Sequence, residues 1–256
     1  MIDVQNQAGN HRIDIDKVGV KNIRYPITVL DKANGTQKTV ASVNMYVNLP
    51  HHYKGTHMSR FVEILSEYRQ QISPDKLPAI LEEMKLRLKA ESAHMELTFP
   101  YFIEKIAPVS GTPGLMEYNC TFIGSVNGQG KDIIVEVVVP ITTLCPCSKE
   151  ISDAGAHNQR GEVKLAARFS KFIWIEDMIK LVERSASSEV FSLLKRSDEK
   201  YITESAYQKP MFVEDLVREI AHKLDQDENI TWFSVSAENY ESIHNHNAYA
   251  YIARQK

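Results

Sequence analysis

Residues 43–49, Val-Asn-Met-Tyr-Val-Asn-Leu, alternate strictly between apolar and polar side chains. A period of two places the apolar side chains on one face of a β-strand. An earlier apolar stretch, residues 23–30, is joined to it through Asn34-Gly35, a dipeptide that favours a tight hairpin turn. The sequence therefore predicts two antiparallel strands with one buried face near the start of the chain.

Two amphipathic helical patterns follow this hairpin. Apolar residues recur at helical spacing from Met58 to Tyr68 and from Leu77 to Leu88, and Ser73-Pro74 separates the two patterns. Strand alternation returns at residues 95–103 and 115–123. The first half of the chain is thus predicted to run strand, strand, helix, helix, strand, strand.

The same order recurs after Asn127-Gly128-Gln129-Gly130. Strand patterns are followed by helical patterns and then by strands, and the charged segment 195–200 is predicted to be a surface connection between the helices. The ranges are 133–139 and 163–169 for strands, 175–186 (with a possible continuation to Leu193) and 213–224 for helices, and 232–238 and 248–252 for strands. We expect an α+β fold with domains at 1–127 and 128–256, each an antiparallel sheet covered by helices on one face.

Composition limits the class of protein and of partner. The 256 residues are 43% hydrophobic and 25% charged, the balance of a globular protein with a substantial core. A net charge of −3 gives no electrostatic reason to expect nucleic acid or an anionic membrane as partner. We find neither a bilayer-length apolar run nor a signal pattern, so we expect a cytoplasmic protein whose cysteines are thiols.

The segment richest in reactive side chains is Leu-Cys-Pro-Cys-Ser-Lys-Glu, residues 144–150, followed by Gly-Ala-His-Asn-Gln-Arg at 155–160. Cys145 and His157 offer the soft and borderline donors that hold late divalent metals, and His244 and His246 add two imidazoles. In so tight a Cys-Pro-Cys link, one cysteine is expected to be the ligand and the other to support it. Two ordinary buried cysteines are an equally good interpretation of the residues alone.

Several other polar residues have ordinary structural explanations. Glu199 lies in the charged connection, and Glu214 complements the dipole of a helix as an acidic first-turn residue. His57 and Arg60 open the first helix, where a phosphate could bind, although a plain capping segment with Thr56 as N-cap explains them equally well. Neither a Walker loop nor Gly-x-Gly-x-x-Gly occurs in the sequence.

Seven motifs together resemble those of the type IB GTP cyclohydrolase I family. They are Gly-Thr-His-Met-Ser-Arg-Phe (55–61), Ala-Pro-Val-Ser-Gly (107–111), Leu-Cys-Pro-Cys-Ser-Lys-Glu-Ile-Ser (144–152), Gly-Ala-His-Asn-Gln-Arg (155–160), Asp-Glu-Lys-Tyr (198–201), Phe-Val-Glu-Asp (212–215) and Glu-Ser-Ile-His-Asn-His (241–246). The resemblance implies a tunnelling fold with two ββααββ units per chain. It also implies a homotetramer with active sites at subunit interfaces. The implied reaction converts GTP and water to 7,8-dihydroneopterin triphosphate and formate, the first step towards tetrahydrofolate.

The resemblance also assigns roles to single residues. It implies that the metal ligands are Cys145, His157, Glu199 and His244, and that Glu214 binds the guanine edge. For Glu199 and Glu214 these implied roles replace the ordinary structural explanations given above. We expect His246 to relay protons beside a ligand. Basic groups for the triphosphate are expected among His57, Arg60, Lys149, Arg160, Arg196 and Lys200. A mixed sulfur, nitrogen and oxygen shell suits zinc, manganese or iron.

Two alternative functions are weighed against this one. A nitrile-reducing enzyme of 7-deazaguanine metabolism has the same fold and uses a cysteine nucleophile with a nicotinamide. It would carry a lone reactive cysteine without a second histidine and glutamate ligand set. A non-catalytic protein with a structural metal would favour a closed, cysteine-rich shell. The mixed set implied here argues against both.

Overall fold

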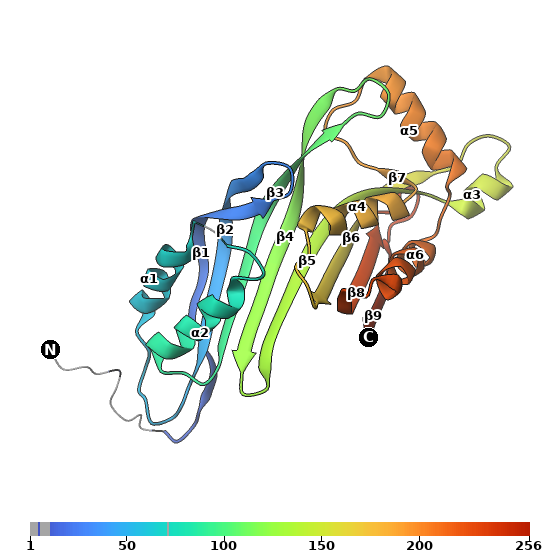
Figure 1. Cartoon of the computed structure of the whole chain (residues 1–256). Coiled ribbons are helices and arrows are strands. Elements are labelled where there is room, and N and C mark those ends of the chain that lie inside the picture. Colours follow the sequence, from blue (N-terminus) through green and yellow to red (C-terminus); the bar gives the residue numbers. More distant parts are fainter. Residues whose placement is uncertain (1–4, 6–10, 71) are drawn as a thin grey trace. The chain divides into compact units, whose positions relative to one another are not determined.

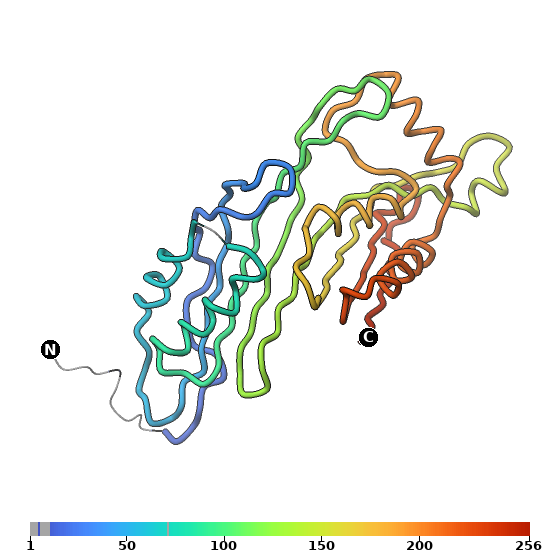
Figure 2. The backbone as a smooth tube through the Cα atoms, in the orientation of Figure 1, coloured from blue at the N-terminus to red at the C-terminus, as the bar shows by residue number. Residues whose placement is uncertain are grey.

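The structure, a computed structural model, describes residue 5 and residues 11–70 and 72–256 (Figures 1 and 2). It is a mixed α+β fold built from antiparallel strands and helices. The strands are β1 (Ile15–Asp31), β2 (Gly35–Leu49), β3 (Ala93–Ile106), β4 (Pro113–Asn127), β5 (Gly130–Leu144), β6 (Asn158–Phe169), β7 (Ser188–Glu189), β8 (Ile230–Asn239) and β9 (Ala248–Gln255). The helices are α1 (Met58–Tyr68), α2 (Leu77–Leu88), α3 (Pro146–Ile151), α4 (Ile175–Ser185), α5 (Arg196–Gln208) and α6 (Val213–Gln226).

The chain packs as two compact units. The first comprises the chain up to Pro100 together with Thr121–Val135, and the second comprises Tyr101–Cys120 and Glu136–Lys256. Strands β3, β4 and β5 each contribute residues to both units. The predicted division at 127/128 falls instead in the turn that joins β4 to β5.

The first unit confirms the hairpin that the alternation predicted. Strands β1 and β2 pair antiparallel around the turn at Asp31–Gly35, and the apolar positions of β2 from Val43 to Leu49 are buried. Asp31 Oδ1 accepts hydrogen bonds from the backbone N–H groups of Ala33 (2.9 Å) and Asn34 (2.7 Å). Gly35 follows with φ of +80°, which glycine adopts without steric cost. Helices α1 and α2 pack against these strands (Figure 1).

The second unit carries α4 and α6 against strands β6, β8 and β9. Strand β8 pairs antiparallel with both β6 and β9, and helix α6 packs on β8 and β9 (Figure 1). The buried faces of the two helices meet those of the strands; they comprise Ile175, Met178, Ile179, Val182, Leu216, Val217, Ile220, Leu224, Phe233 and Val235. This core supports the loops that carry most of the candidate site residues.

Two parts of the second unit differ from the prediction. Helix α4 ends at Ser185 and does not continue to Leu193, because residues 188–189 form β7 and pair with Ile141 and Thr142 of β5. The charged segment predicted as a surface connection is the beginning of helix α5. Both outcomes depend on partners that are distant in the sequence.

A buried ionic cluster anchors the segment after α4. Lys105 Nζ lies 2.7 Å from Glu183 Oε1 and 2.7 Å from Glu189 Oε2, and it donates to the carbonyl oxygen of Val190 (3.0 Å). The hydroxyl of Tyr118 also donates to Glu183 Oε1 (2.6 Å). Burial raises the pKa of the Glu183 carboxyl, although Lys105 opposes the shift. The cluster therefore ties β3 and β4 to α4 and to the chain leading into α5.

Candidate functional site

Cys145 stands at the N-terminus of helix α3. It is the N-cap residue, and its Sγ accepts a hydrogen bond from the backbone N–H of Ser148 (3.4 Å). Pro146 at the first helical position supplies the backbone angle that begins a helix without losing a required N–H group. Cys145 is half-buried and Cys147 is exposed, so the two thiols have different surroundings. Cys120 is buried, and burial raises the pKa of its thiol.

His157 lies beside Cys145 because the backbone joins them. The N–H of Cys145 donates to the carbonyl oxygen of His157 (3.1 Å), and the N–H of His157 donates to Ser148 Oγ (3.2 Å). These two bonds close the loop that contains α3 at the point where β5 ends and β6 begins. The thiol and the imidazole predicted as metal donors are therefore held at neighbouring positions of the backbone.

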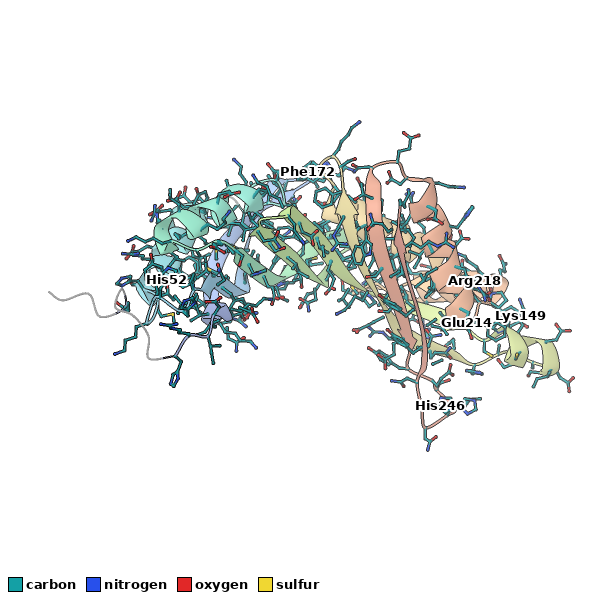
Figure 3. All side chains as sticks on the ribbon, turned by 90° about the horizontal axis from the view of Figure 1, so that it is seen from below. His52, Lys149, Phe172, Glu214, Arg218 and His246 are labelled. Atoms are coloured by element: carbon teal, nitrogen blue, oxygen red, sulfur yellow. The ribbon has the colours of Figure 1, made fainter. Side chains whose placement is uncertain are left out.

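The loop that connects β8 to β9 contacts His157. Ser242 Oγ lies 3.3 Å from Nδ1 of His157. His244 and His246 are exposed on this connection, and their rings stack with centroids 5.1 Å apart. Both histidines lie in the loop between Asn239, where β8 ends, and Ala248, where β9 begins. Figure 3 shows His246 at the tip of this loop.

Glu241 was not selected from the sequence, although it belongs to one of the motifs. Its Oε2 atom is buried and has no hydrogen-bond partner among the residues that the structure describes. A buried carboxylate oxygen without a partner is costly and calls for an explanation such as a ligand. The sequence signal was weak, because a glutamate two residues past a strand is commonly a solvated surface residue.

Glu199 lies in the first turn of α5 and is exposed. Its neighbour Asp198 is fully buried and accepts hydrogen bonds from the backbone N–H groups of Val109 and Ser110 (both 2.8 Å). Asp198 also accepts from Ser110 Oγ (2.6 Å) and from the N–H of Lys195 (2.8 Å). Burial opposes its ionisation, but these bonds outweigh burial and hold the pKa of Asp198 well below its usual range. The 107–111 motif thus fastens the start of α5 to the β3–β4 hairpin (Figure 2).

Glu214 is exposed in the first turn of α6. The N–H of Met211 donates to the carbonyl oxygen of Leu144 (3.0 Å), which places the residue before Cys145 next to the segment that begins α6. The exposed carboxylate of Glu214, three residues after this contact, can act as a hydrogen-bond acceptor.

The basic candidates fall into three environments. The Lys149 ammonium already has partners within the chain. It donates to the carbonyl oxygen of Tyr207 and lies 4.3 Å from the centre of the Tyr207 ring. Figure 3 shows Lys149 and Glu214 on the same side of the second unit. Arg196 and Lys200 are exposed near the beginning of α5, and Arg160 is exposed on β6. Among the described residues, Lys200 makes one long ionic contact, with Glu204 (3.8 Å), so this ammonium can reach a ligand at little cost.

His57 and Arg60 belong to the first unit, whereas the other candidates belong to the second. His57, rather than the predicted Thr56, is the N-cap residue of α1. Arg60 Nη1 donates to the carbonyl oxygen of Arg87 at the end of α2 (2.8 Å). This contact joins the two helices and engages part of the guanidinium.

The four predicted metal ligands do not all meet in the described part of one chain. Cys145 and His157 are neighbours, and the loop of His244 contacts His157 through Ser242. Across residues 11–70 and 72–256, no three His, Cys, Asp or Glu side chains are grouped closely enough to hold a metal ion. Tyr207, the residue that contacts Lys149, lies eight residues after Glu199 in α5. Eight residues of helix rise by about 12 Å, so Glu199 is at the far end of α5 from the Lys149 contact.

Within residues 11–70 and 72–256, no helix is both long enough and apolar enough to cross a membrane.

Comparison with known proteins gives consistent sequence matches. A family model described as "Type I GTP cyclohydrolase folE2" matches residues 1–250. A GTP cyclohydrolase FolE2 from Syntrophus aciditrophicus is 62% identical over 255 residues, covering 100% of both chains. A GTP cyclohydrolase FolE2 from Geobacter sulfurreducens is 57% identical over 256 residues, covering 100% of this chain and 99% of the relative.

Solved structures resemble the chain in fold. Uricase from Arthrobacter globiformis gives a TM-score of 0.55 at 7% identity, over 94% of this chain and 93% of that one. Urate oxidase from Bacillus sp. TB-90 gives 0.53 at 8% identity, over 94% and 100% of the two chains. At such low identity these similarities concern the fold alone.

Proposed function

The chain belongs to the type I GTP cyclohydrolase FolE2 family and is a GTP cyclohydrolase of folate biosynthesis, and we propose that its reaction site is built on Cys145 and His157. The reaction converts GTP and water to 7,8-dihydroneopterin triphosphate and formate. The observation that carries the placement of the site is the backbone hydrogen bond between these two residues (3.1 Å). It holds a thiol and an imidazole together beside the start of α6.

The donor chemistry of this pair fits a divalent metal. Cys145 offers a sulfur donor from the N-cap position of α3. His157 has its Nδ1 atom engaged by Gln159 and Ser242, so Nε2 is the nitrogen that would bind the metal. When bound, a divalent cation supplies Lewis acidity, which is what water needs to add to C8 of guanine near neutral pH. Zinc, manganese and iron all suit such donors.

Glu199 and His244 complete the proposed ligand set of Cys145, His157, Glu199 and His244. His244 lies on the connection that contacts His157 through Ser242. Glu199 is exposed on α5 and available to a metal site formed with another copy of the chain. The proposal therefore includes a homotetramer with active sites at subunit interfaces.

The assembly proposal is supported by the two terminal strands of the sheet, of which β1 carries only a short bridge, Val29 to Ile72, on its outer side within the described residues. Strand β1 ends the strand order in the first unit, and β9 ends it in the second. Tyr249 and Tyr251 project exposed from β9. Exposed edges are covered or closed in stable proteins, and two tandem ββααββ tunnelling-fold units closing into a barrel would do so. Sedimentation of a fully active monomer at micromolar concentration would contradict this assembly.

Glu214 is proposed to bind the guanine edge of GTP. Its exposed carboxylate can accept from the guanine N1–H and the 2-amino group in two charge-assisted bonds. The hydrogen bond between Met211 and Leu144 keeps the start of α6 next to Cys145. The residue proposed to bind the base and the residues proposed to bind the metal therefore lie on neighbouring segments. A carboxylate at this position selects guanine over adenine, which presents no matching donor pair.

Proton transfer and triphosphate binding are assigned to the remaining residues. His246 stacks on His244 and is exposed, so it can exchange protons with solvent and with a substrate beside its neighbour. Arg160, Arg196 and Lys200 are the exposed triphosphate candidates. Lys149, Arg60 and His57 are further triphosphate candidates, although Lys149 and Arg60 would first give up contacts with backbone carbonyl groups.

The type IB subtype and a cytoplasmic location are also proposed, and both rest on the sequence.

Formate release tests this function directly. The purified full-length protein is incubated with GTP, with and without a chelator, and formate and the pterin product are measured. We expect turnover to stop with the chelator and to return when a divalent ion is added. Turnover in metal-stripped protein, or a covalent adduct of substrate on Cys145, would favour a cysteine-nucleophile mechanism instead.

A further inference from the structure

A buried side-chain amide connects the core of the second unit to the ring of His157. Gln159 is 6% exposed, and its Nε2 donates to Oγ1 of Thr143 (3.0 Å), which is itself fully buried. At the other end of the amide, Oε1 of Gln159 lies 3.1 Å from Nδ1 of His157. Gln159 is on β6 and Thr143 is on β5, so two strands of the sheet hold the amide in place.

The direction of this amide determines which nitrogen of the ring carries the proton. An amide has donors at its nitrogen and only acceptor capacity at its oxygen. Because the nitrogen faces Thr143, the oxygen faces His157, and the contact is a hydrogen bond only if Nδ1 bears the proton. Oγ of Ser242, 3.3 Å from the same Nδ1, can share that proton as a second acceptor. In the neutral ring Nε2 is then left with its lone pair.

We propose that Gln159 is a positioning residue that keeps His157 in the Nδ1–H tautomer and directs Nε2 to the metal. This inference rests on the proposed function, in which His157 is a metal ligand. A ligating histidine normally donates its second N–H to a fixed acceptor, which sets the ring orientation and strengthens the donor nitrogen. Gln159 supplies that acceptor from a buried, rigid part of the sheet, whereas Ser242 supplies a weaker one from a loop.

The tautomer is measured in the metal-free protein. Nitrogen-15 NMR of the imidazole ring distinguishes a protonated nitrogen from a bare one, and a His157→Ala variant assigns the signals. We expect a protonated Nδ1 and a bare Nε2 in the neutral ring of the wild type. Gln159→Leu should give a mixture of both tautomers, because the fixed acceptor is lost. A wild-type ring protonated at Nε2 would overturn the inference.

Metal affinity provides the second readout, and a matched control is available. Zn²⁺ binding is measured by competition with a chromophoric chelator, and Gln159→Leu should weaken it by about 10–100-fold. Gln159→Glu keeps an acceptor towards Nδ1 and can accept from Thr143, so it should restore most of the affinity. Gln226→Leu removes another Gln–His contact, the exposed one with His222 on α6 (3.1 Å), and should change neither readout.

The outcomes separate this inference from the proposed function. If His157→Ala loses Zn²⁺ but Gln159→Leu keeps wild-type affinity, Gln159 does not position the ring and the inference is wrong. If His157→Ala keeps Zn²⁺, the proposed metal site is wrong and the role of Gln159 fails with it. The tautomer measurement then still shows whether the ring is oriented as described. If Gln159→Leu does not fold, Thr143→Val tests the same amide: we expect a tautomer mixture, and an unchanged tautomer would overturn the inference.

Discussion

The backbone N–H of Cys145 donates to the carbonyl oxygen of His157, and the nitrogen and oxygen atoms are 3.1 Å apart. The bond closes a loop of 11 intervening residues and joins the end of β5 to the start of β6. The bond fixes the backbones of both residues, and contacts with Ser148, Gln159 and Ser242 orient the two side chains. Such preorganisation reduces the entropy lost when a ligand set forms.

The two cysteines of the Cys-Pro-Cys segment should differ in their contribution to metal binding. Cys145→Ala should lower metal affinity by about a hundredfold or more, because even outer partners of a metal site change affinity by 10–100-fold. It should also abolish formate release while leaving the protein folded. Cys147→Ala, at an exposed position, should be mild. Metal content after dialysis and formate production measure both effects, and near wild-type turnover of Cys145→Ala at low metal would remove it from the ligand set.

Glu214→Gln should weaken GTP binding much more than metal binding. The amide cannot accept two guanine N–H donors with a full negative charge, and losing such bonds costs about 2–3 kcal/mol, or roughly 30–150-fold in affinity. Calorimetric titration with GTP measures the change. Glu219→Gln is the control, since Glu219 is an exposed glutamate of the same helix that pairs with Lys223 (3.1 Å). Equal GTP affinity in the two variants would place Glu214 outside the purine site.

The three thiols should react with alkylating reagents in a fixed order. Cys147 is exposed and should be labelled first, whereas half-buried Cys145 should follow and be protected by bound metal. Cys120 is buried, and burial raises the pKa of its thiol, so it should react only after unfolding. Peptide mass spectrometry with and without Zn²⁺ measures the order. Protection of Cys147 rather than Cys145 by Zn²⁺ would exchange their roles.

Lys105→Met should destabilise the second unit by about 3–5 kcal/mol, because it leaves the buried carboxylate of Glu183 without its cation. Both tryptophans, Trp174 and Trp232, lie in this unit, so urea unfolding followed by their fluorescence reports the effect. Lys164→Met removes a more exposed pair in the same unit, with Glu136 (3.3 Å), and should cost less than about 1 kcal/mol. Similar losses for the two variants would mean that the buried cluster adds no more than a surface ion pair.

Asp31 should make the stability of the first unit depend on pH. Burial opposes its ionisation, but hydrogen bonds from Asn34, Gln37 and Ala33 outweigh burial and lower the pKa of Asp31 below its ordinary 3.8. A lowered folded-state pKa gives stability that is present above pH 3.8 and is lost as the pH falls through the folded pKa. Asp31→Asn should therefore be less stable than wild type at pH 7.

Urea unfolding followed by circular dichroism at pH 7 and under acidic conditions measures this dependence. The difference between wild type and Asp31→Asn should shrink on acidification. Asp16→Asn, at an exposed position of β1, should show little difference at either pH. A difference between wild type and Asp31→Asn that is constant with pH would mean that the turn, not the charge, accounts for the effect.

Local periodicity predicted most of the secondary structure. The alternation in β2 and β8 and the apolar spacing in α1, α2, α4 and α6 depend only on which face of each element is buried. The motifs likewise indicated a type I GTP cyclohydrolase, without confirmation of the IB subtype, and named Cys145 and His157 as metal donors. These features lie within a few residues of one another, so the sequence carries them without reference to distant partners.

Tertiary contacts decided the remainder. Helix α4 stops at Ser185 because β5 offers an edge to residues 188–189, and α5 begins at Arg196 because Asp198 is held by the 107–111 hairpin loop. The ring of His157 is oriented by Gln159 and Ser242, the latter 85 residues away in the chain. No local pattern encodes these bonds, because each depends on a donor or acceptor that only the folded chain brings within about 3 Å.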